Sequence, residues 1–444
     1  MKLVLAGASS IFVTCLANLY LISGNTIYSN SNSIIYMLHT GIKQGLPLSP
    51  YLFLFYIDDI FIYLDDQFSD TCIHIHDRLH ILIHADDANL LATTRDMMIQ
   101  KLKALLIFCN KNSIILQVTK CWFAVINGSE EDKHPLQISE NETVKYAEFL
   151  EILGSHISDQ LKNDLQRHFK KRFKNVIKYF NYIRMNKEAP LSVKLKVLKS
   201  CVVTTLLYNC EAFGPCLPDG LEEVYFRMLR AALGVRSNCP NLILLIETGF
   251  LPLQCMVLAR QLKFYRRFQL SIQPNSTRAE MFEHLLNVEN HTSYLKHYIE
   301  LDQKYPNVTD LFKEHTEKMK ATIRNKGVNK DKHYKFWVYL QMNPELTLSP
   351  FLQRVDAVGK SMVKFRVGSH NLPIETGRWN RTPREERLCA TCGVIGDEDH
   401  VLFRCSMIDR SDLNGLPPTV SAIWQHEGVN RLFKRILSEK LVEV

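Results

Sequence analysis

Long apolar runs dominate the N-terminal part of the chain. Residues 3–24 carry no charge and are mostly apolar, which predicts a buried helix followed by a strand. A second apolar run, 51–57, directly follows a Ser-Pro pair. Ser49 suits the N-cap of a helix and Pro50 its first position, so the second run is predicted to be helical.

Two adjacent acids, Asp86 and Asp87, are flanked by short apolar runs on both sides. This pattern predicts a β-hairpin that carries both carboxylates at its tip. Neighbouring carboxylates repel each other unless a cation lies between them, and oxygen ligands favour Mg²⁺. Aspartate is also common in turns, so a plain polar turn is the alternative.

Two other acid pairs precede this hairpin. Asp58 and Asp59 continue the helical run that begins at Ser49, and we interpret them as acids at a helix end. The pair at 65–66 lacks the flanking apolar runs. His80, with the histidines at 74 and 76, is expected on a surface loop rather than at a metal.

Residues 164–184 show the spacing of an amphipathic helix, with cations between the apolar positions. The predicted apolar stripe consists of residues 165, 169, 173, 176, 177, 180 and 183. The cations predicted to bind nucleic acid are Lys170, Lys171, Arg172, Lys174 and Lys178. A solvated helix surface without a ligand is the alternative.

The composition is that of an ordinary globular protein. The chain has 444 residues, of which 46% are hydrophobic and 23% charged, which excludes a disordered chain and a disulfide-rich miniprotein. The net charge of +8 is unevenly distributed, because residues 162–199 hold twelve Lys and Arg against two acids. Such a block suits a polyanion, whose neutralised phosphates release counterions.

Four residues near the C-terminus have the spacing of a zinc site. Cys389, Cys392, His400 and Cys405 are separated by two, seven and four residues. Three thiolates and one imidazole can complete a tetrahedral Zn²⁺ centre. Coincidence among twelve cysteines and sixteen histidines is the alternative.

Some features imitate a secreted protein. The N-terminal apolar run resembles a signal sequence, and Asn-x-Ser/Thr triplets begin at six asparagines. The other cysteines are scattered singly, however, so no disulfide framework is predicted. We interpret the run as protein core and expect an intracellular protein, in the cytoplasm or nucleus, without a membrane anchor. A signal peptide or anchor is the alternative.

The order of the motifs resembles a known family. A loop beginning at Gly41, of the form GxxQGxPLSPxLF, is followed about thirty residues later by the Ala-Asp-Asp hairpin. This order resembles the palm of a reverse transcriptase, and most closely that of non-long-terminal-repeat (LINE-type) retrotransposons. Further segments resemble that family in the same order: 108–125, 149–157 with its Leu-Gly pair, 194–214 and 377–405.

The resemblance implies RNA-directed DNA synthesis by two Mg²⁺ ions. Asp86 and Asp87 would hold the metal, and Lys120 would lie near the nucleotide phosphates. Gln44 and Gly45 would position nucleotide and template. The implied partners are an RNA template, a DNA primer and deoxynucleoside triphosphates, with Zn²⁺ in the C-terminal knuckle; the oligomeric state stays open.

One expected residue is missing. The family's third metal-binding aspartate precedes the Gln-Gly loop, whereas the first acid in this chain is Asp58. We therefore expect a truncated remnant that begins within the palm, lacks fingers and endonuclease, and polymerises poorly or not at all. A non-catalytic protein that binds RNA or DNA and derives from a retrotransposon is the alternative.

The predicted fold class is α+β. Residues 1–157 would form a partial palm and residues 158–250 a basic helical thumb. Residues 251–345 would form a helical connector to which the pattern assigns no chemistry. Residues 346–444 would form a C-terminal region with the zinc knuckle.

Overall fold

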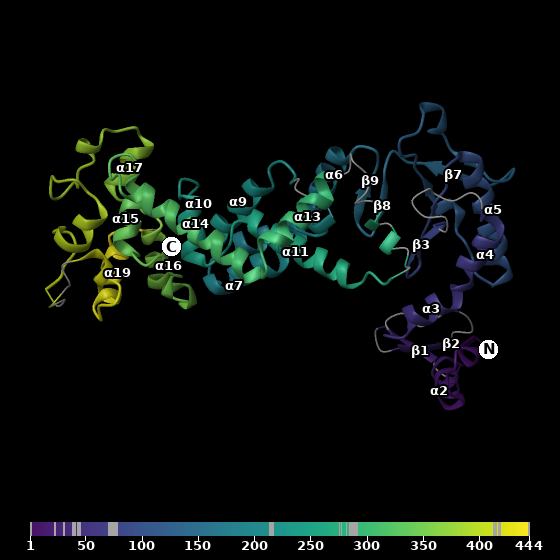
Figure 1. Ribbon diagram of the computed structural model, residues 1–444. Coiled ribbons are helices and arrows are strands. Elements are labelled where there is room, and N and C mark those ends of the chain that lie inside the picture. The colour runs from purple at the N-terminus through teal and green to yellow at the C-terminus, as the bar shows by residue number, and fades with distance from the viewer. Residues whose placement is uncertain are drawn as a thin grey trace. The chain divides into compact units, whose positions relative to one another are not determined.

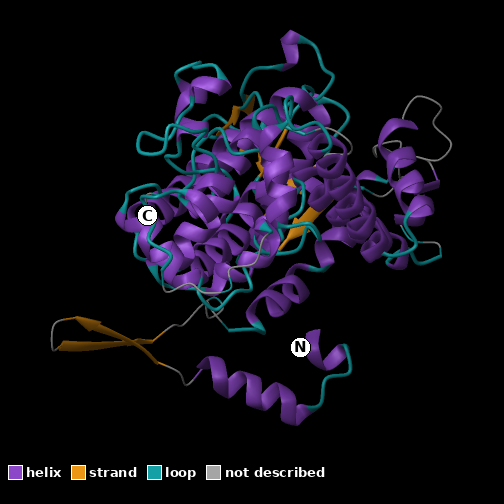
Figure 2. Ribbon diagram, turned by 90° about the vertical axis from the view of Figure 1, so that its left-hand side faces the viewer, coloured by secondary structure: helices purple, strands orange, loops and turns teal. Residues whose placement is uncertain are grey.

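The chain folds into two compact units in the computed structural model (Figure 1), one of residues 1–150 with 274–284 and one of residues 151–273 with 285–444. Among the described residues, all named strands lie before residue 158, and the regular secondary structure after that point is helical (Figure 2). The described residues are 2–21, 24–29, 32–37, 41, 46–69, 79–212, 217–274, 276, 278–280, 282–283, 292–411, 415 and 419–442.

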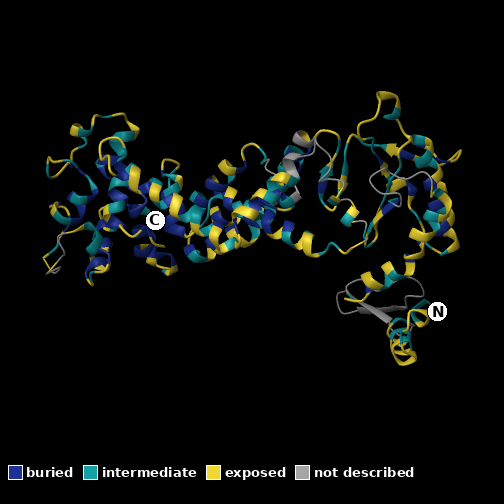
Figure 3. Cartoon of the chain, viewed as in Figure 1, coloured by how far each residue is buried: buried dark blue, intermediate teal, exposed yellow. Residues whose placement is uncertain are grey.

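The N-terminal segment contains the predicted helix and strand, but the helix is not buried. Helix α2 (Ser10–Leu21) precedes the antiparallel pair β1 (Gly24–Ser29) and β2 (Asn32–Met37). Ile11 is 75% exposed, so the prediction of a core helix here is wrong (Figure 3). Hydrophobicity alone does not show what packs on a helix, and α2 lacks a distinct polar face.

The second apolar run is helical as predicted. It forms α3 (Ser49–Ile57), and α4 (Asp59–Phe68) follows after Asp58. The capping prediction is wrong by one position, because Leu48 is the N-cap and Ser49 lies inside the helix. The Ser49 hydroxyl instead forms a 3.0 Å hydrogen bond with the hydroxyl of Tyr20.

The core of the first unit lies around helix α5 (Arg95–Lys111), which packs against α4 and two small sheets. One sheet is the hairpin of β3 (Ile81–His84) and β4 (Asp87–Leu90). The other has the order β5-β7-β6, with β7 parallel to β5 and antiparallel to β6. Its strands and the neighbouring 3-10 turn are β5 (Trp122–Phe123), β6 (Leu136–Gln137), β7 (Thr143–Tyr146) and η1 (Val118–Lys120).

The second unit begins with a short hairpin and continues as helices. Its largest core contains Ile183, Leu229, Phe365 and Phe433, so it extends almost through the whole unit. The boundaries expected at 250/251 and 345/346 both fall inside this core. The main elements are β8 (Leu150–Ile152), β9 (Ser155–Ile157), α6 (Leu161–Met185), α7 (Leu191–Val197), α9 (Leu221–Leu233), α10 (Asn241–Thr248), α11 (Leu253–Leu270), α13 (Thr292–Lys304), α14 (Val308–Gly327), α15 (Tyr334–Met342), α16 (Ala357–Arg366), α17 (Pro373–Trp379) and α19 (Val429–Ser438).

Buried charges tie these helices together. The Arg366 guanidinium of α16 donates two hydrogen bonds to the Glu247 carboxylate of α10, at 2.9 and 3.1 Å. The Tyr339 hydroxyl of α15 donates a third, at 2.9 Å. Nearby, Lys335 and Glu375 form a second buried ion pair at 2.9 Å. A buried charge is tolerated only when it is paired, so these contacts fix how the helices pack.

Among the described helices, none is by itself both long and apolar enough to cross a membrane. Helices α10 and α11 meet the length and composition only when taken together, across a bend of 59°.

Removing the Glu247 carboxylate should destabilise the second unit strongly. We expect Glu247→Ala to lower its free energy of unfolding by about 3–5 kcal/mol, because the Arg366 guanidinium stays buried without its partner. Urea denaturation followed by tryptophan fluorescence measures this. The control is Glu223→Ala, which removes an exposed pair with Arg227 at 2.7 Å and should cost less than about 1 kcal/mol. Equal effects would contradict the prediction.

Candidate active site, nucleic-acid interface and metal centre

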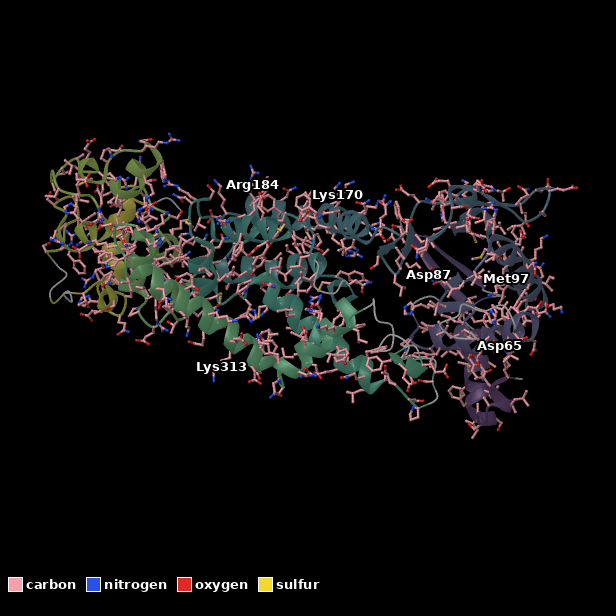
Figure 4. All side chains as sticks on the ribbon, turned by 45° about the horizontal axis from the view of Figure 1, so that its top comes forward. Asp65, Asp87, Met97, Lys170, Arg184 and Lys313 are labelled. Atoms are coloured by element: carbon pink, nitrogen blue, oxygen red, sulfur yellow. The ribbon has the colours of Figure 1, made fainter. Side chains whose placement is uncertain are left out.

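The hairpin predicted around the two acids is present. In the β3–β4 pair His84 lies opposite Asp87, so Ala85 and Asp86 form a two-residue turn. Ala85 has a φ of 53°, in the left-handed region that such tight hairpin turns require. Asp86 therefore lies in the turn, and Asp87, which is labelled in Figure 4, begins β4. Both side chains are exposed. Two exposed carboxylates at one tip have the hard oxygen donors that suit Mg²⁺.

His80 anchors the base of this hairpin, so its expected place on a surface loop is wrong. Its side chain is buried, and Nε2 lies 3.2 Å from Oδ1 of Asp65 on α4. Its carbonyl oxygen accepts a 2.8 Å hydrogen bond from Leu91, which extends the β3–β4 pairing. Burial and the charge of Lys101 lower the pKa of His80, and Asp65 only partly offsets them.

Lys120 is exposed at the end of η1, which packs against β7. Within the described part of the chain, no hydrogen bond or ion pair joins Lys120 to Asp86 or Asp87. Gln44 and Gly45 lie outside the described residues.

Asp58 and Asp59 lie where one helix ends and the next begins, in line with their interpretation as acids at a helix end. Asp58 separates α3 from α4, and Asp59 begins α4. The Asp59 carboxylate pairs with the Lys2 ammonium at 2.6 Å.

The basic segment forms the predicted helix, α6. Leu165, Val176 and Ile183 of its apolar stripe are buried, whereas Ile177 is 40% exposed, so its assignment to the stripe is wrong. On the polar side, Lys170, Lys174 and Lys178 are exposed and follow one another at intervals of four residues. This spacing places three ammonium groups along one face of the helix.

Lys171 and Arg172 have partners within the protein. Lys171 forms an ion pair with Glu151 of β8, and its hydrogen bond lowers the pKa of that carboxyl. Arg172 donates a 2.7 Å hydrogen bond to the carbonyl oxygen of Gly154, in the β8–β9 turn. Gly154 has a φ of 76°, and a Cβ there would lie 2.6 Å from the guanidinium. Both residues hold the hairpin against α6, a role that sequence reasoning missed.

Tyr208 completes this attachment. Its ring lies 4.1 Å from the Arg172 guanidinium, and its hydroxyl donates a 2.9 Å hydrogen bond to Leu153 of the same turn. Its carbonyl oxygen lies 2.9 Å from Nε2 of His168, whose pKa is lowered by burial. The sequence shows a glycine, Gly154, that suits a tight turn. It does not show that Arg172 and Tyr208 pack against this turn.

The far end of α6 is held as well. The buried ammonium of Lys360, on α16, donates a 2.8 Å hydrogen bond to the carbonyl oxygen of Lys187 and a 3.4 Å one to that of Glu188. These carbonyls follow the last turn of α6. These hydrogen bonds hold the segment that directly follows α6.

The four predicted zinc ligands come together. The ligand atoms of Cys389, Cys392, His400 and Cys405 all lie within 4.8 Å of one another. The sulfurs of Cys389 and Cys405 are 3.8 Å apart, and those of Cys392 and Cys405 are 4.0 Å apart. Two thiolates on one tetrahedral zinc lie roughly 3.8 Å apart, given Zn–S bonds of about 2.3 Å. Nε2 of His400 is buried without a hydrogen-bond partner, as a ligand nitrogen without its ion would be.

The Cys389, Cys392, His400 and Cys405 cluster is built into the core of the second unit. Cys389 and Cys405 belong to the same buried cluster as Phe365 and Phe433. Arg410 supports the turn that carries His400 and Cys405, and its guanidinium donates a 2.6 Å hydrogen bond to the carbonyl oxygen of Cys405. The site is therefore part of the helical body and not a separate knuckle.

Comparison with models of protein families gives a match to part of the chain. Residues 8–188, which are 181 of the 444 residues, match the family model described as reverse transcriptase (RNA-dependent DNA polymerase). A search of the curated proteins gives no match. The matched segment contains the β3–β4 hairpin, the β8–β9 hairpin and all of α6. It supports a reverse transcriptase domain of mixed helices and strands.

The metal centre can be tested in the full chain. We expect metal analysis of the purified protein to give about one zinc per chain, and Cys389→Ser or Cys405→Ser to lose it. Cys201→Ser, at a half-buried cysteine outside the cluster, should keep the metal. A wild-type protein without zinc that unfolds like the zinc-treated protein would contradict the assignment.

Proposed function

We propose that the chain belongs to the reverse transcriptase part of a LINE-type retrotransposon and that its ancestral activity is RNA-directed DNA synthesis. The family match over residues 8–188 carries this proposal. The order of the Gly41 loop and the Asp86–Asp87 hairpin within the matched segment supports the LINE type.

The hairpin acids have the central role in this proposal. Asp86 and Asp87 would bind Mg²⁺, which offsets charge on the reacting phosphates when it is bound. Lys120 would stabilise the nucleotide phosphates by its positive charge, and Gln44 with Gly45 would position template and nucleotide. The substrates are a DNA primer on an RNA template and deoxynucleoside triphosphates.

Helix α6 is the proposed thumb surface. The exposed Lys170, Lys174 and Lys178 present charge along a helix that two anchors hold in place. We assign Lys171 and Arg172 a smaller share of phosphate binding than their charge implies, because both already have partners within the protein. We further propose that the Cys389 site holds Zn²⁺ and that the protein is intracellular.

A second candidate function is nucleic-acid binding without catalysis. It is favoured by the absence of any Asp or Glu before Asp58 in the sequence, where the family's third metal-binding aspartate would stand. Polymerisation requires carboxylates that approach two metal ions from more than one strand. Asp86 and Asp87 are adjacent in one hairpin.

The proposed thumb surface predicts salt-sensitive binding. Replacing Lys170, Lys174 and Lys178 with Ala should reduce the slope of log K against log salt concentration by about 2.7 on a primer–template, since each lost phosphate contact contributes about 0.9. Fluorescence anisotropy over a salt series measures it. The matched control replaces three other exposed lysines of the same unit, Lys263, Lys313 and Lys434. An unchanged slope in the first variant would place the binding surface elsewhere.

The missing aspartate predicts weak or absent polymerisation by this chain. Loss of one metal-binding carboxylate removes both positioning and charge stabilisation, which should lower the rate by several orders of magnitude. Primer extension on an RNA template with Mg²⁺ or Mn²⁺ tests this.

The control for that experiment is the Asp86→Ala, Asp87→Ala double variant. Robust extension by the wild-type chain, abolished in the double variant, would show that another group completes the metal site. The prediction of weak polymerisation would then be wrong, while the reverse transcriptase assignment would stand.

A further inference from the structure

A surface on the second unit combines exposed cations with aromatic rings. It lies where the loop after α14, the start of α15 and the end of α17 meet (Figure 1). We call it the α17 surface and define it by Lys330, Trp337, Arg378, Trp379, Arg381 and Arg384.

Cations lie directly over the rings of this surface. The Lys330 ammonium is 4.2 Å from the centre of the Trp337 ring. The Arg384 guanidinium is 4.7 Å from the buried ring of Tyr334, which packs in turn against Trp337 at 6.0 Å. The contacts through Tyr334 make the surface continuous from Lys330 to Arg384.

Trp379 is held in place and is still accessible. The Arg236 guanidinium lies 4.1 Å from the centre of its ring, and that guanidinium also donates a 2.8 Å hydrogen bond to the carbonyl oxygen of His370. Arg236 therefore covers one side of the indole as part of the fold. The tryptophan is nevertheless 43% exposed, so a flat ring of fixed orientation faces solvent.

Arg381 has an unfavourable backbone for its residue type. It follows α17 with a φ of 56°, and the amide of Thr382 donates a 2.8 Å hydrogen bond to the carbonyl oxygen of Gly377. This is the helix-ending turn in which glycine is the preferred residue. The backbone conformation at position 381 favours glycine. Arginine is strained there, but it adds an exposed, positively charged side chain.

Acids limit what this surface can bind. Asp331 pairs with Arg384 at 3.6 Å, and Glu375 pairs with Arg378 at 3.1 Å, while Arg381 has no ion-pair partner among the described residues. These cations also pack against rings, so a purely structural role is the alternative. That alternative does not account for an arginine at the glycine-type position or for the exposed indole. A ligand that stacks on a ring and offers a phosphate accounts for both.

We infer that the α17 surface binds single-stranded nucleic acid, with one base stacked on Trp379 and an adjacent phosphate on Arg381. The inference rests on the proposed nucleic-acid-binding function and adds a contact for unpaired strand that is separate from α6. Stacking on aromatic rings accepts any base, so binding should show little sequence preference.

The decisive variant is Arg381→Gly in the full-length chain. Because glycine suits the local φ, this variant should have an unchanged or higher melting temperature and yet bind a short fluorescent oligouridylate more weakly. The slope of log K against log salt concentration should fall by about 0.7, the contribution of one phosphate on a single strand. Lys313→Ala, at an exposed lysine on α14, is the control and should leave binding unchanged.

Stacking has its own measurement. The chain has four tryptophans, so the oligonucleotide should quench fluorescence in the wild type, and Trp379→Phe should remove the quenching specific to this site. Trp379→Ala should weaken binding about fivefold or more, given the usual strength of base stacking.

Two results would overturn the inference. One is wild-type affinity and salt dependence in both Arg381→Gly and Trp379→Ala. The other is equal quenching at Trp379 by polyglutamate, which would identify the surface as a site for acidic protein. The triple α6 variant separates the two proposals: if it alone loses binding, the proposed function stands and this inference fails. If only the α17 variants lose binding, α6 is not the binding surface and this inference stands.

Discussion

The packing of the second unit depends most on the hydrogen bonds and ion pair of the buried Glu247 carboxylate. It lies on α10 and accepts hydrogen bonds from Arg366 on α16 and Tyr339 on α15. A charge removed from water requires such partners, so three helices that are distant in sequence are fixed relative to one another. Glu375 and Glu398 are also buried and paired: Glu375 lies 2.9 Å from Lys335, and Glu398 lies 3.0 Å from His370. The pKa of Glu398 is lowered overall. Burial acts to raise it, but the hydrogen bond and charge interaction with His370 act in the opposite direction and prevail.

These contacts change how the C-terminal region is understood. The sequence suggested a tail with a small knuckle, because the ligand spacing is short and local. In the structure Cys389 and Cys405 lie in the core that also contains Phe365, so zinc and helices would stabilise each other. The α17 surface depends on the same packing, since Arg236 orients Trp379 from a loop more than 130 residues earlier.

The features predicted well from sequence are those encoded by short-range patterns. Apolar runs around Asp86 gave the hairpin, a helical stripe gave α6, and ligand spacing gave the metal cluster. What failed depends on residues far along the chain. The buried His80, just before β3, is paired with Asp65 on α4, and the role of Arg172 requires the turn at Gly154. Charge type alone does not distinguish a cation that is free for a ligand from one that holds the fold together.

Helix α6 is held near its middle, where Arg172 bonds to the β8–β9 turn, and just after its C-terminus, where Lys360 bonds to the carbonyl oxygen of Lys187. Along the helix, each residue advances by about 1.5 Å and turns by about 100°, so the number of residues determines where each lysine side chain lies. Exchanging lysine for arginine at Lys174 keeps the charge in place, whereas inserting or deleting one residue rotates every later cation out of line. During sequence drift, substitutions in this helix would therefore accumulate much more readily than changes in its length.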